Sequence, residues 1–483
     1  MKNSRRRHSL SLILIFSLLF CLVPFSRDLS AFSPAPARGR NAMVASQHEL
    51  ASKIGVDILK KGGNAVDAAI AVGLALAVVY PEAGNIGGGG FMLIRSPKGD
   101  THAIDYREMA PAGAHRDIYV DKNGDLIRGE GSSTVGYRAS GVPGTLAGFE
   151  LAFKKYGSKR VSWAELVRPA RLLADNGYTL THRLAELFKT YKSTLSQYPE
   201  SKRVFLKEGQ FFEEGDIFRQ PDLGRTLARV EREGAKDFYS GLTAKMIADD
   251  MKANGGLITL DDMRNYRAKE REPLVGTYRG HKIISMPPPS SGGIVMLQVL
   301  NMMEGYSVND LPFGSAARLH ILAEAMRRSF ADRAEYMADP DFANVPVSSL
   351  IDKKYAESRR SSIKSRSASA SKDIRFGTIA GRESMDTTHY TVVDKSGMVV
   401  SNTYTINDLY GSRVTIKGTG ILMNDEMDDF AARPGRPNLF GLVQGERNKV
   451  EPGKRPLSSM TPTIVLRKDG SIWFALGARG GPR

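Results

Sequence analysis

The sequence predicts an α+β protein, and three observations support that prediction. Residues 65–79 are apolar nearly all round, which is typical of a helix buried on every side. Residues 91–94 form a short apolar run behind a glycine-rich turn, as a buried strand does. Residues 388–394 and 398–405 are rich in β-forming residues and flank a turn, so they predict two consecutive strands.

The composition indicates a globular protein with a sizeable core. The 483 residues are 41% hydrophobic and 25% charged, enough for one large domain or two ordinary ones. The formal net charge of +16 is interpreted as a solvated basic surface. Basic repeats interleaved with aromatic residues are missing from the sequence, so no nucleic-acid partner is expected. The eight histidines show no paired metal-ligand spacing, and neither a metal nor a cofactor is expected.

The N-terminus predicts a secretory signal peptide over residues 1–31. Basic residues precede an apolar run over residues 10–25, which is short for a membrane span. Its removal would give a secreted, periplasmic protein, and an uncleaved N-terminal membrane anchor is the alternative. The single cysteine, Cys21, lies in this run, so we expect no disulfide and no cysteine nucleophile in the mature chain.

Each further element follows from a local pattern. Residues 47–79 predict two helices separated at Gly62 and Gly63, where one helix is capped and the next begins. Glycines over residues 85–90 are followed by a strand. A phosphate-binding loop would lead into a helix, so close backbone packing is the better interpretation. Mainly helical patterns cover residues 161–268, a proline-rich turn over 287–293 opens a helix at 294–303, and another helix covers 316–336.

The composition changes over residues 357–386. This stretch is rich in serine and has little to bury, so we expect a mobile segment. Ordinarily such a segment would link two domains. Here it leads directly into the two strands that begin at Thr388.

The register of these strands depends on the length of their turn. A three-residue loop over 395–397 would pair Asp394 with Met398 and place Thr387 opposite Thr405. A two-residue loop would place Tyr404 there instead. Either hairpin can bring a second hydroxyl group beside Thr387.

Several motifs, in a fixed order, resemble those of the γ-glutamyltransferase family. They are Tyr-Arg-Glu-Met-Ala-Pro from Tyr106, Ser-Ser-Gly-Gly from Ser290, Thr-Thr-His-Tyr-Thr-Val-Val-Asp from Thr387, Met-Asp-Asp-Phe from Met427 and Leu-Ser-Ser-Met-Thr-Pro-Thr from Leu457. The resemblance runs from about Ala42 to the last residue and implies an N-terminal nucleophile hydrolase. Such a protein has an αββα four-layer sandwich, formed jointly by the two parts of a self-cleaved precursor.

The resemblance implies cleavage between Asp386 and Thr387. The large subunit would be residues 32–386 and the small subunit residues 387–483, paired as a heterodimer. Cleavage exposes the α-amine of Thr387, whose reference pKa of about 7.7–8.0 suits a general base near neutral pH. Thr387 would be the nucleophile, because a threonine hydroxyl needs such an adjacent base. Thr405 would orient it, and the backbone N–H groups of Gly480 and Gly481 would form an oxyanion hole.

The same resemblance implies a clamp for the α-amino acid part of the substrate. Arg107 would pair with the α-carboxylate, a task suited to its planar guanidinium. Ser458 and Ser459 would add hydrogen bonds to that carboxylate. The α-amino group would be held by Asn407, Glu426 and Asp429. His389 is expected to be structural.

The implied donors are glutathione and other γ-glutamyl compounds, and the implied acceptors are water and the amines of amino acids or peptides. Residues 431–453 resemble a lid loop with Phe440 at its tip, and a solvent-exposed loop is the alternative. Because the chain ends at Arg483, we expect the small subunit to be incomplete. Two other functions stay open: a related acylase for cephalosporin side chains or poly-γ-glutamate, and a truncated remnant without activity.

Overall fold

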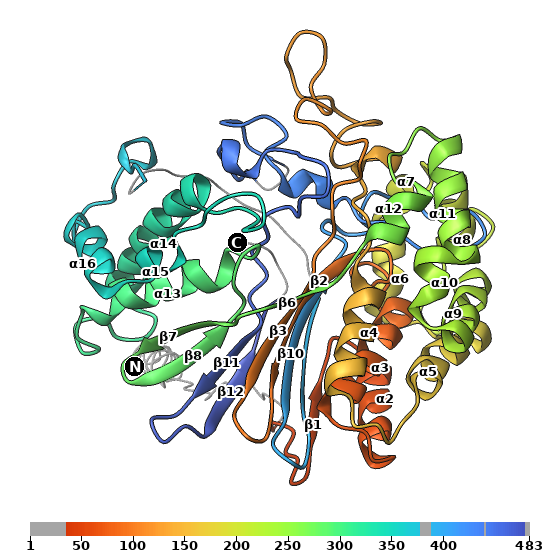
Figure 1. Ribbon diagram of the computed structural model, residues 1–483, viewed down its shortest axis with the longest axis horizontal. Coiled ribbons are helices and arrows are strands. Elements are labelled where there is room, and N and C mark those ends of the chain that lie inside the picture. Colours follow the sequence, from red (N-terminus) through yellow and green to blue (C-terminus); the bar gives the residue numbers. More distant parts are fainter. Residues whose placement is uncertain (1–34, 377–387, 439–440, 479–483) are drawn as a thin grey trace, which may run out of the picture. The chain divides into compact units, whose positions relative to one another are not determined.

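The computed structural model describes residues 35–376, 388–438 and 441–478. The chain divides into two compact units, Met1–Arg40 and Asn41–Arg483, and the second holds every helix and strand described below (Figure 1). The signal peptide predicted over residues 1–31 lies outside the described residues. So do Asp386, Thr387, Gly480, Gly481 and Phe440.

A six-stranded antiparallel sheet forms the centre of the second unit. Its strand order is β1-β9-β10-β2-β3-β6, so strands from the two ends of the sequence lie side by side. β9 and β10 are buried along most of their length because both faces of the sheet are covered. The strands are β1 Met43–Ala45, β9 Thr388–Val393, β10 Val399–Thr405, β2 Gly89–Arg95, β3 Thr101–Tyr106 and β6 Lys269–Arg271.

The hairpin of β9 and β10 has the three-residue turn. Asp394 N–H donates to the Met398 carbonyl at 3.1 Å, and Gly397 has a φ of 83° that favours glycine. Val393 lies opposite Val399 and Thr388 opposite Tyr404. The predicted three-residue register is therefore confirmed for the described pairs, and the predicted pairing of Thr387 with Thr405 lies outside them.

A second, four-stranded sheet packs against the first. Its order is β12-β11-β8-β7. Apolar side chains from both sheets meet between them, including Phe91, Leu93, Ile284 and Ile464. The strands are β7 Leu274–Tyr278, β8 His281–Ser285, β11 Thr463–Leu466 and β12 Ile472–Leu476.

Helices cover the outer face of each sheet. α3 packs on β9 and β10, and α13 packs on β7 (Figure 1). This arrangement is the predicted αββα sandwich. The helices over the six-stranded sheet are α2 Glu49–Lys60, α3 Ala65–Val79, α4 Thr145–Tyr156 and α5 Trp163–Asn176, and those of the other layer are α13 Gly292–Glu304, α14 Ala316–Tyr336, α15 Val347–Leu350 and α16 Lys353–Ser361.

Local signals fix where α3 begins. The Asn64 side chain accepts from the N–H groups of Val66 and Asp67, and the Asp67 carboxylate accepts from Asn64 N–H, which makes a capping box. The bounds predicted for α3 and α14 are confirmed. The region 161–268 is mainly helical, as predicted, with α6 His182–Thr190, α7 Lys192–Leu195, α8 Pro199–Phe205, α9 Pro221–Glu233, α10 Ala235–Ser240, α11 Leu242–Ala253, α12 Leu260–Asn265 and the short strands β4 Tyr178–Thr179 and β5 Ile217–Phe218.

The start of the segment predicted to be mobile is structured. α16 extends to Ser361, and Ser369 N–H donates to Glu324 of α14 at 3.0 Å. Arg327 Nη1 donates back to the Ser369 carbonyl at 2.8 Å. Charged groups of α14 therefore hold a serine-rich stretch whose own side chains bury little. Residues 377–386 of that segment lie outside the described residues.

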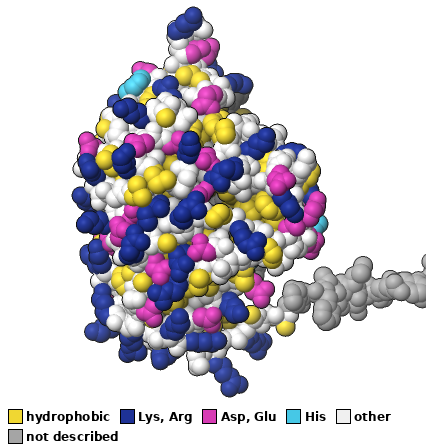
Figure 2. All heavy atoms as spheres, turned by 90° about the vertical axis from the view of Figure 1, so that its right-hand side faces the viewer, with side chains coloured by type: hydrophobic (Ala, Val, Ile, Leu, Met, Phe, Trp, Pro, Cys, Tyr) yellow, Lys and Arg dark blue, Asp and Glu magenta, His cyan; other side chains and the backbone are white. Residues whose placement is uncertain are grey.

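The surface charge is dispersed on the face formed by the helices of the region 161–268. Figure 2 shows Lys and Arg side chains mixed with Asp and Glu across this face. This view fits the interpretation of the net charge as a solvated surface. Among the helices of the described ranges, none is both long and apolar enough to cross a membrane.

Candidate active site

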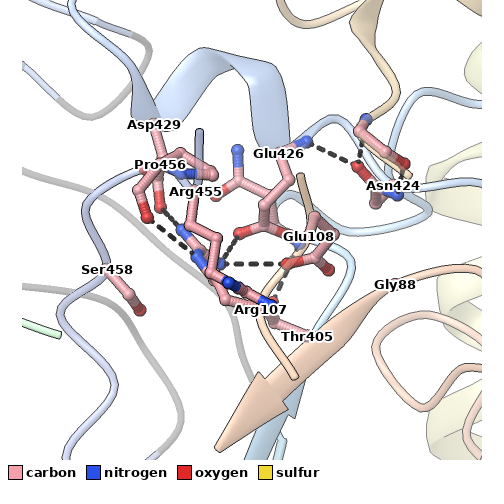
Figure 3. Close-up of polar contacts among 12 residues, drawn as sticks. Gly88, Arg107, Glu108, Thr405, Asn424, Glu426, Asp429, Arg455, Pro456 and Ser458 are labelled. Atoms are coloured by element: carbon pink, nitrogen blue, oxygen red, sulfur yellow. Dashed lines mark hydrogen bonds and ion pairs between the residues drawn. The ribbon is translucent and has the colours of Figure 1, made fainter. Parts of the chain in front are cut away.

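Arg107 follows the last residue of β3 and is completely buried at the centre of a group of carboxylates. Its Nη1 donates to Glu426, its Nη2 donates to Asp429, and Nη1 lies 3.5 Å from Glu108 Oε2 (Figure 3). Its Nε donates to the Pro456 carbonyl at 3.1 Å. We call Arg107, Glu108, Glu426 and Asp429 the clamp cluster. It brings together three of the residues that the sequence predicts to bind an α-amino acid.

The clamp cluster has more acidic groups than basic ones. Burial raises the pKa of Glu426 to about 7, although Arg107 acts to lower it. Burial and the neighbouring Glu426 raise the pKa of Glu108 well above its ordinary value. The Glu108 side chain is completely buried, and Glu108 Oε1 and Glu426 Oε2 accept no hydrogen bond from the described residues. Glu108 and Glu426 therefore hold protons more readily than free carboxylic acids do, and the cluster has three carboxyl groups for its single guanidinium.

The end of β10 places Thr405 and Asn407 close to this cluster. Asn407 N–H donates to Thr405 Oγ1 at 2.8 Å, and Asn407 has a φ of 76°, which asparagine tolerates better than most residues. The Asn407 side-chain amide donates to the Asp425 carbonyl at 3.0 Å, next to Glu426. Asn85 Nδ2 donates to the Thr405 carbonyl at 2.8 Å, which ties β10 to the glycine-rich segment.

That glycine-rich segment packs tightly against the strand ends. A Cβ atom on Gly88 would lie 2.1 Å from the Thr405 carbonyl, and one on Gly89 would lie 2.4 Å from the Tyr106 carbonyl. Only glycine fits at these distances. The predicted close backbone packing is confirmed.

Ser458 and Ser459 approach Arg107 on a segment from the far end of the sequence. Ser458 N–H donates to the Pro289 carbonyl at 2.9 Å, and its carbonyl accepts from Ser291 N–H and Oγ at 2.8 and 2.7 Å. The buried Oγ of Ser459 has no hydrogen-bond partner among the described residues. An unpaired buried hydroxyl is suited to a polar substrate group.

The comparisons with known proteins agree with this geometry. The sequence model of the family Gamma-glutamyltranspeptidase matches residues 51–483. The chain belongs to the gamma-glutamyltranspeptidase family. It is 49% identical over 449 residues to the glutathione hydrolase proenzyme of Escherichia coli (strain K12), a match that covers 93% of this chain and 77% of that protein.

Other members of the gamma-glutamyltranspeptidase family extend the likeness. The chain is 40% identical to the acylase ACY 1 proenzyme of Pseudomonas sp. (strain SE83), covering 93% of this chain and 78% of the relative. The solved gamma-glutamyltranspeptidase of Helicobacter pylori superimposes with a TM-score of 0.69 at 46% identity, covering 71% of this chain and 97% of that one. The cephalosporin acylase of Bacillus halodurans gives 0.76 at 26% identity, covering 92% and 80%. These likenesses confirm the predicted N-terminal nucleophile hydrolase fold.

A loop over residues 431–453 folds back onto the clamp cluster. Gln444 Nε2 and Asn448 Nδ2 both donate to the Asp429 carbonyl, at 2.9 and 2.7 Å. The loop thereby fixes the backbone of a residue that contacts Arg107. Its predicted tip, Phe440, lies outside the described residues.

His389 is the second residue of β9, two residues after Thr387. Its Nδ1 is 2.9 Å from Thr403 Oγ1, and its Nε2 is 3.0 Å from Thr391 Oγ1. Burial lowers the pKa of this imidazole to about 4, so it is neutral at neutral pH. A neutral ring bridging two strands agrees with the structural role that the sequence predicts.

Two contributors to the site were not given a role from the sequence. Glu108 lies in the Tyr-Arg-Glu motif directly after Arg107, so its position was a usable signal. No sequence pattern indicated Pro456, because it contributes through its backbone carbonyl, which every residue type has. Within the described ranges, acidic, histidine and cysteine side chains form no group of three or more that could hold a metal ion.

Proposed function

We propose that this chain transfers γ-glutamyl groups from glutathione and other γ-glutamyl amides to water or to the amine of an amino acid or peptide. The observation that carries the proposal is the clamp cluster, in which a buried guanidinium lies between an excess of carboxyl groups. An α-amino acid carries one carboxylate and one ammonium group. A site with a planar cation next to acidic groups complements both charges.

In this proposal the substrate's α-carboxylate binds Arg107 and the hydroxyls of Ser458 and Ser459. Its α-ammonium binds Glu426, Asp429 and Asn407. The substrate's two charges take over contacts that the clamp residues otherwise make with one another, so the buried charges stay compensated after binding. The loop over residues 431–453 covers the bound donor.

The chemistry proposed for Thr387 begins with its release as a new N-terminus. Cleavage of the Asp386–Thr387 bond gives a free α-amine, which takes the proton of the Thr387 hydroxyl as that oxygen attacks the γ-carbonyl. Gly480 and Gly481 stabilise the oxyanion. The amine of the donor leaves with a proton, and water or an acceptor amine then releases the γ-glutamyl group from the ester.

The large and small parts stay paired after cleavage, and residues 1–31 direct the chain to the periplasm. A second candidate is the acylase reaction, since the chain is 40% identical to an acylase proenzyme over 93% of its length. We favour γ-glutamyl transfer because the complete set of charged clamp residues suits an α-amino acid.

Gel electrophoresis and a chromogenic assay test the proposal. The purified protein should separate into two fragments divided between Asp386 and Thr387, and Thr387→Ala should remain one chain. The wild type should release the chromophore from L-γ-glutamyl-p-nitroanilide and should not cleave a glutaryl anilide, which lacks the α-amine. A wild-type protein that never divides, or that prefers the glutaryl compound, would contradict the proposal.

A further inference from the structure

A second group of charges, most of them buried, lies behind Arg107, and the proposed function does not use it. It contains three carboxylates and three cations from separate parts of the chain. We call it the support cluster, and its members are Asp105, Lys269, Arg271, Asp339, Asp341 and Arg455.

The support cluster and a neighbouring tyrosine hold the backbone of Arg107 from both sides. Asp105 Oδ1 accepts from Arg107 N–H at 3.0 Å, and the Tyr266 hydroxyl donates to the Arg107 carbonyl at 2.7 Å. Both side chains are buried. The direction in which the Arg107 side chain leaves the main chain is therefore set by two hydrogen bonds that involve no substrate group.

Arg455 connects Asp105 and Tyr266, which hold the Arg107 backbone, to the chain segment that carries Pro456. Its N–H donates to Asp339 Oδ2 at 2.8 Å, and its Nη2 donates to the Arg267 carbonyl at 2.6 Å. Its Nε lies 3.4 Å from Asp105 Oδ1, and its guanidinium lies 5.8 Å from the Tyr266 ring centre. The buried, planar guanidinium thus combines a hydrogen bond to the Arg267 carbonyl with an ion pair to Asp105 and a contact to the Tyr266 ring, a set that the compact ammonium of lysine cannot reproduce.

The residues after Arg455 contact Arg107 or are proposed to bind the substrate's α-carboxylate. Pro456 follows directly, and its carbonyl accepts from Arg107 Nε at 3.1 Å. Ser458 and Ser459 come next. A shift of Arg455 would therefore move the Pro456 carbonyl and the two serines relative to Arg107.

We propose that Arg455 is a positioning residue for the carboxylate-binding half of the clamp, acting through Pro456 and through the Asp105 and Tyr266 contacts to Arg107. The inference rests on the proposed function, because it concerns the α-carboxylate of a γ-glutamyl donor. Arg455 fixes the distance between the Arg107 fork and the two serine hydroxyls. Its loss should weaken recognition of the carboxylate more than it slows the chemical step.

The test compares two donors in Arg455→Lys. One is L-γ-glutamyl-p-nitroanilide, and the other is 4-aminobutyryl-p-nitroanilide, which keeps the amine and lacks the α-carboxylate. KM for the first donor should rise about tenfold, as expected for one charge-assisted hydrogen bond, with kcat changed less than about threefold. KM for the second should match that of the wild type. A purely structural role would change both donors alike.

Tyr266→Phe is the second variant, because it removes one hydroxyl and keeps the ring beside Arg455. KM for the carboxylated donor should rise about fivefold, the factor expected for a neutral hydrogen bond. Tyr178→Phe is its matched control, since the buried Tyr178 hydroxyl donates to the Val78 carbonyl at 3.1 Å. Arg328→Lys is the control for Arg455, because buried Arg328 is bonded to Glu324 and Ser362 in another layer. Neither control should change KM for either donor.

The outcomes separate this inference from the proposed function. A wild-type protein that turns over neither donor counts against the proposed function. An active wild type with unchanged KM in both Arg455→Lys and Tyr266→Phe, or with equal changes for the two donors, overturns the inference alone. If Arg455→Lys does not fold, Tyr266→Phe decides the question, again by comparing the change in KM for the two donors.

Discussion

Two ionic clusters meet at Arg107, and they differ in charge balance. The clamp cluster has one cation among three carboxyl groups, whereas the support cluster has three cations and three carboxylates. A balanced cluster needs no further partner, and it is suited to holding neighbouring chain segments in place. An unbalanced one has more carboxyl groups than guanidinium groups, so it can accept a further cation, which an ammonium-bearing substrate supplies.

The most damaging change should be the removal of the only cation of the clamp cluster. Arg107→Met should lower kcat/KM for L-γ-glutamyl-p-nitroanilide by about a thousandfold and destabilise the fold by about 3–5 kcal/mol, because buried carboxylates lose their partner. Steady-state kinetics and urea unfolding check both numbers. A variant with normal stability and normal KM would show that the cluster is not the donor site.

A smaller loss of kcat/KM is expected when the clamp cluster loses the charge of one carboxylate, Glu426. The pKa of Glu426 is raised to about 7 by burial, so the carboxylate is ionised above that pH and is lost as the pH falls. In the proposed mechanism, donor binding needs ionised Glu426, and catalysis needs the neutral amine of Thr387. In the wild type, log kcat/KM should therefore rise with a slope near two below about pH 7.

Glu426→Gln should reduce that slope to about one, because only the amine still titrates, and it should raise KM about tenfold. Measuring kcat/KM between pH 5.5 and 9 tests the assignment. Glu82→Gln offers a control, since Glu82 is also buried beside an arginine, Arg183, but lies outside both clusters. An unchanged slope in Glu426→Gln would remove Glu426 from ammonium binding.

The smallest effect should come from the rim of the support cluster. Arg271 lowers the pKa of Asp341, through two hydrogen bonds at 3.0 and 2.7 Å, and this carboxylate is about one-third exposed. A depressed pKa adds stability above the unfolded value near 3.8, and this contribution is lost as the pH falls towards the folded value. Asp341→Asn should therefore unfold about 1 kcal/mol more easily at pH 7, and this difference from wild type should shrink as the pH falls below about 4. KM should stay unchanged, and a raised KM would mean that the rim also positions Arg107.

The sequence was most informative where structure is set by neighbours in the chain. The start of α3 follows from Asn64 and Asp67, three residues apart, and the residues of one turn limit the hairpin to two registers, of which the structure has the three-residue one. The clamp residues could be named from motifs. Their direct pairing could not, because Arg107 and Glu426 are 319 residues apart in the sequence and meet only in the folded chain. The support cluster had no sequence signal, since it depends on the pairing of β3 with β6 that places Asp105 opposite Lys269.

The strand order has a consequence for the sequence of events during maturation. β9 and β10 lie between β1 and β2, so the chain after Thr387 supplies the middle of a sheet whose edges come from the chain before it. Asp394 also accepts from Ala65 N–H at 3.0 Å and caps α3 across the same division. Neither part can complete this sheet alone. If the proposed cut before Thr387 occurs, a cut after folding would leave both parts joined through the strand pairs β1–β9 and β10–β2.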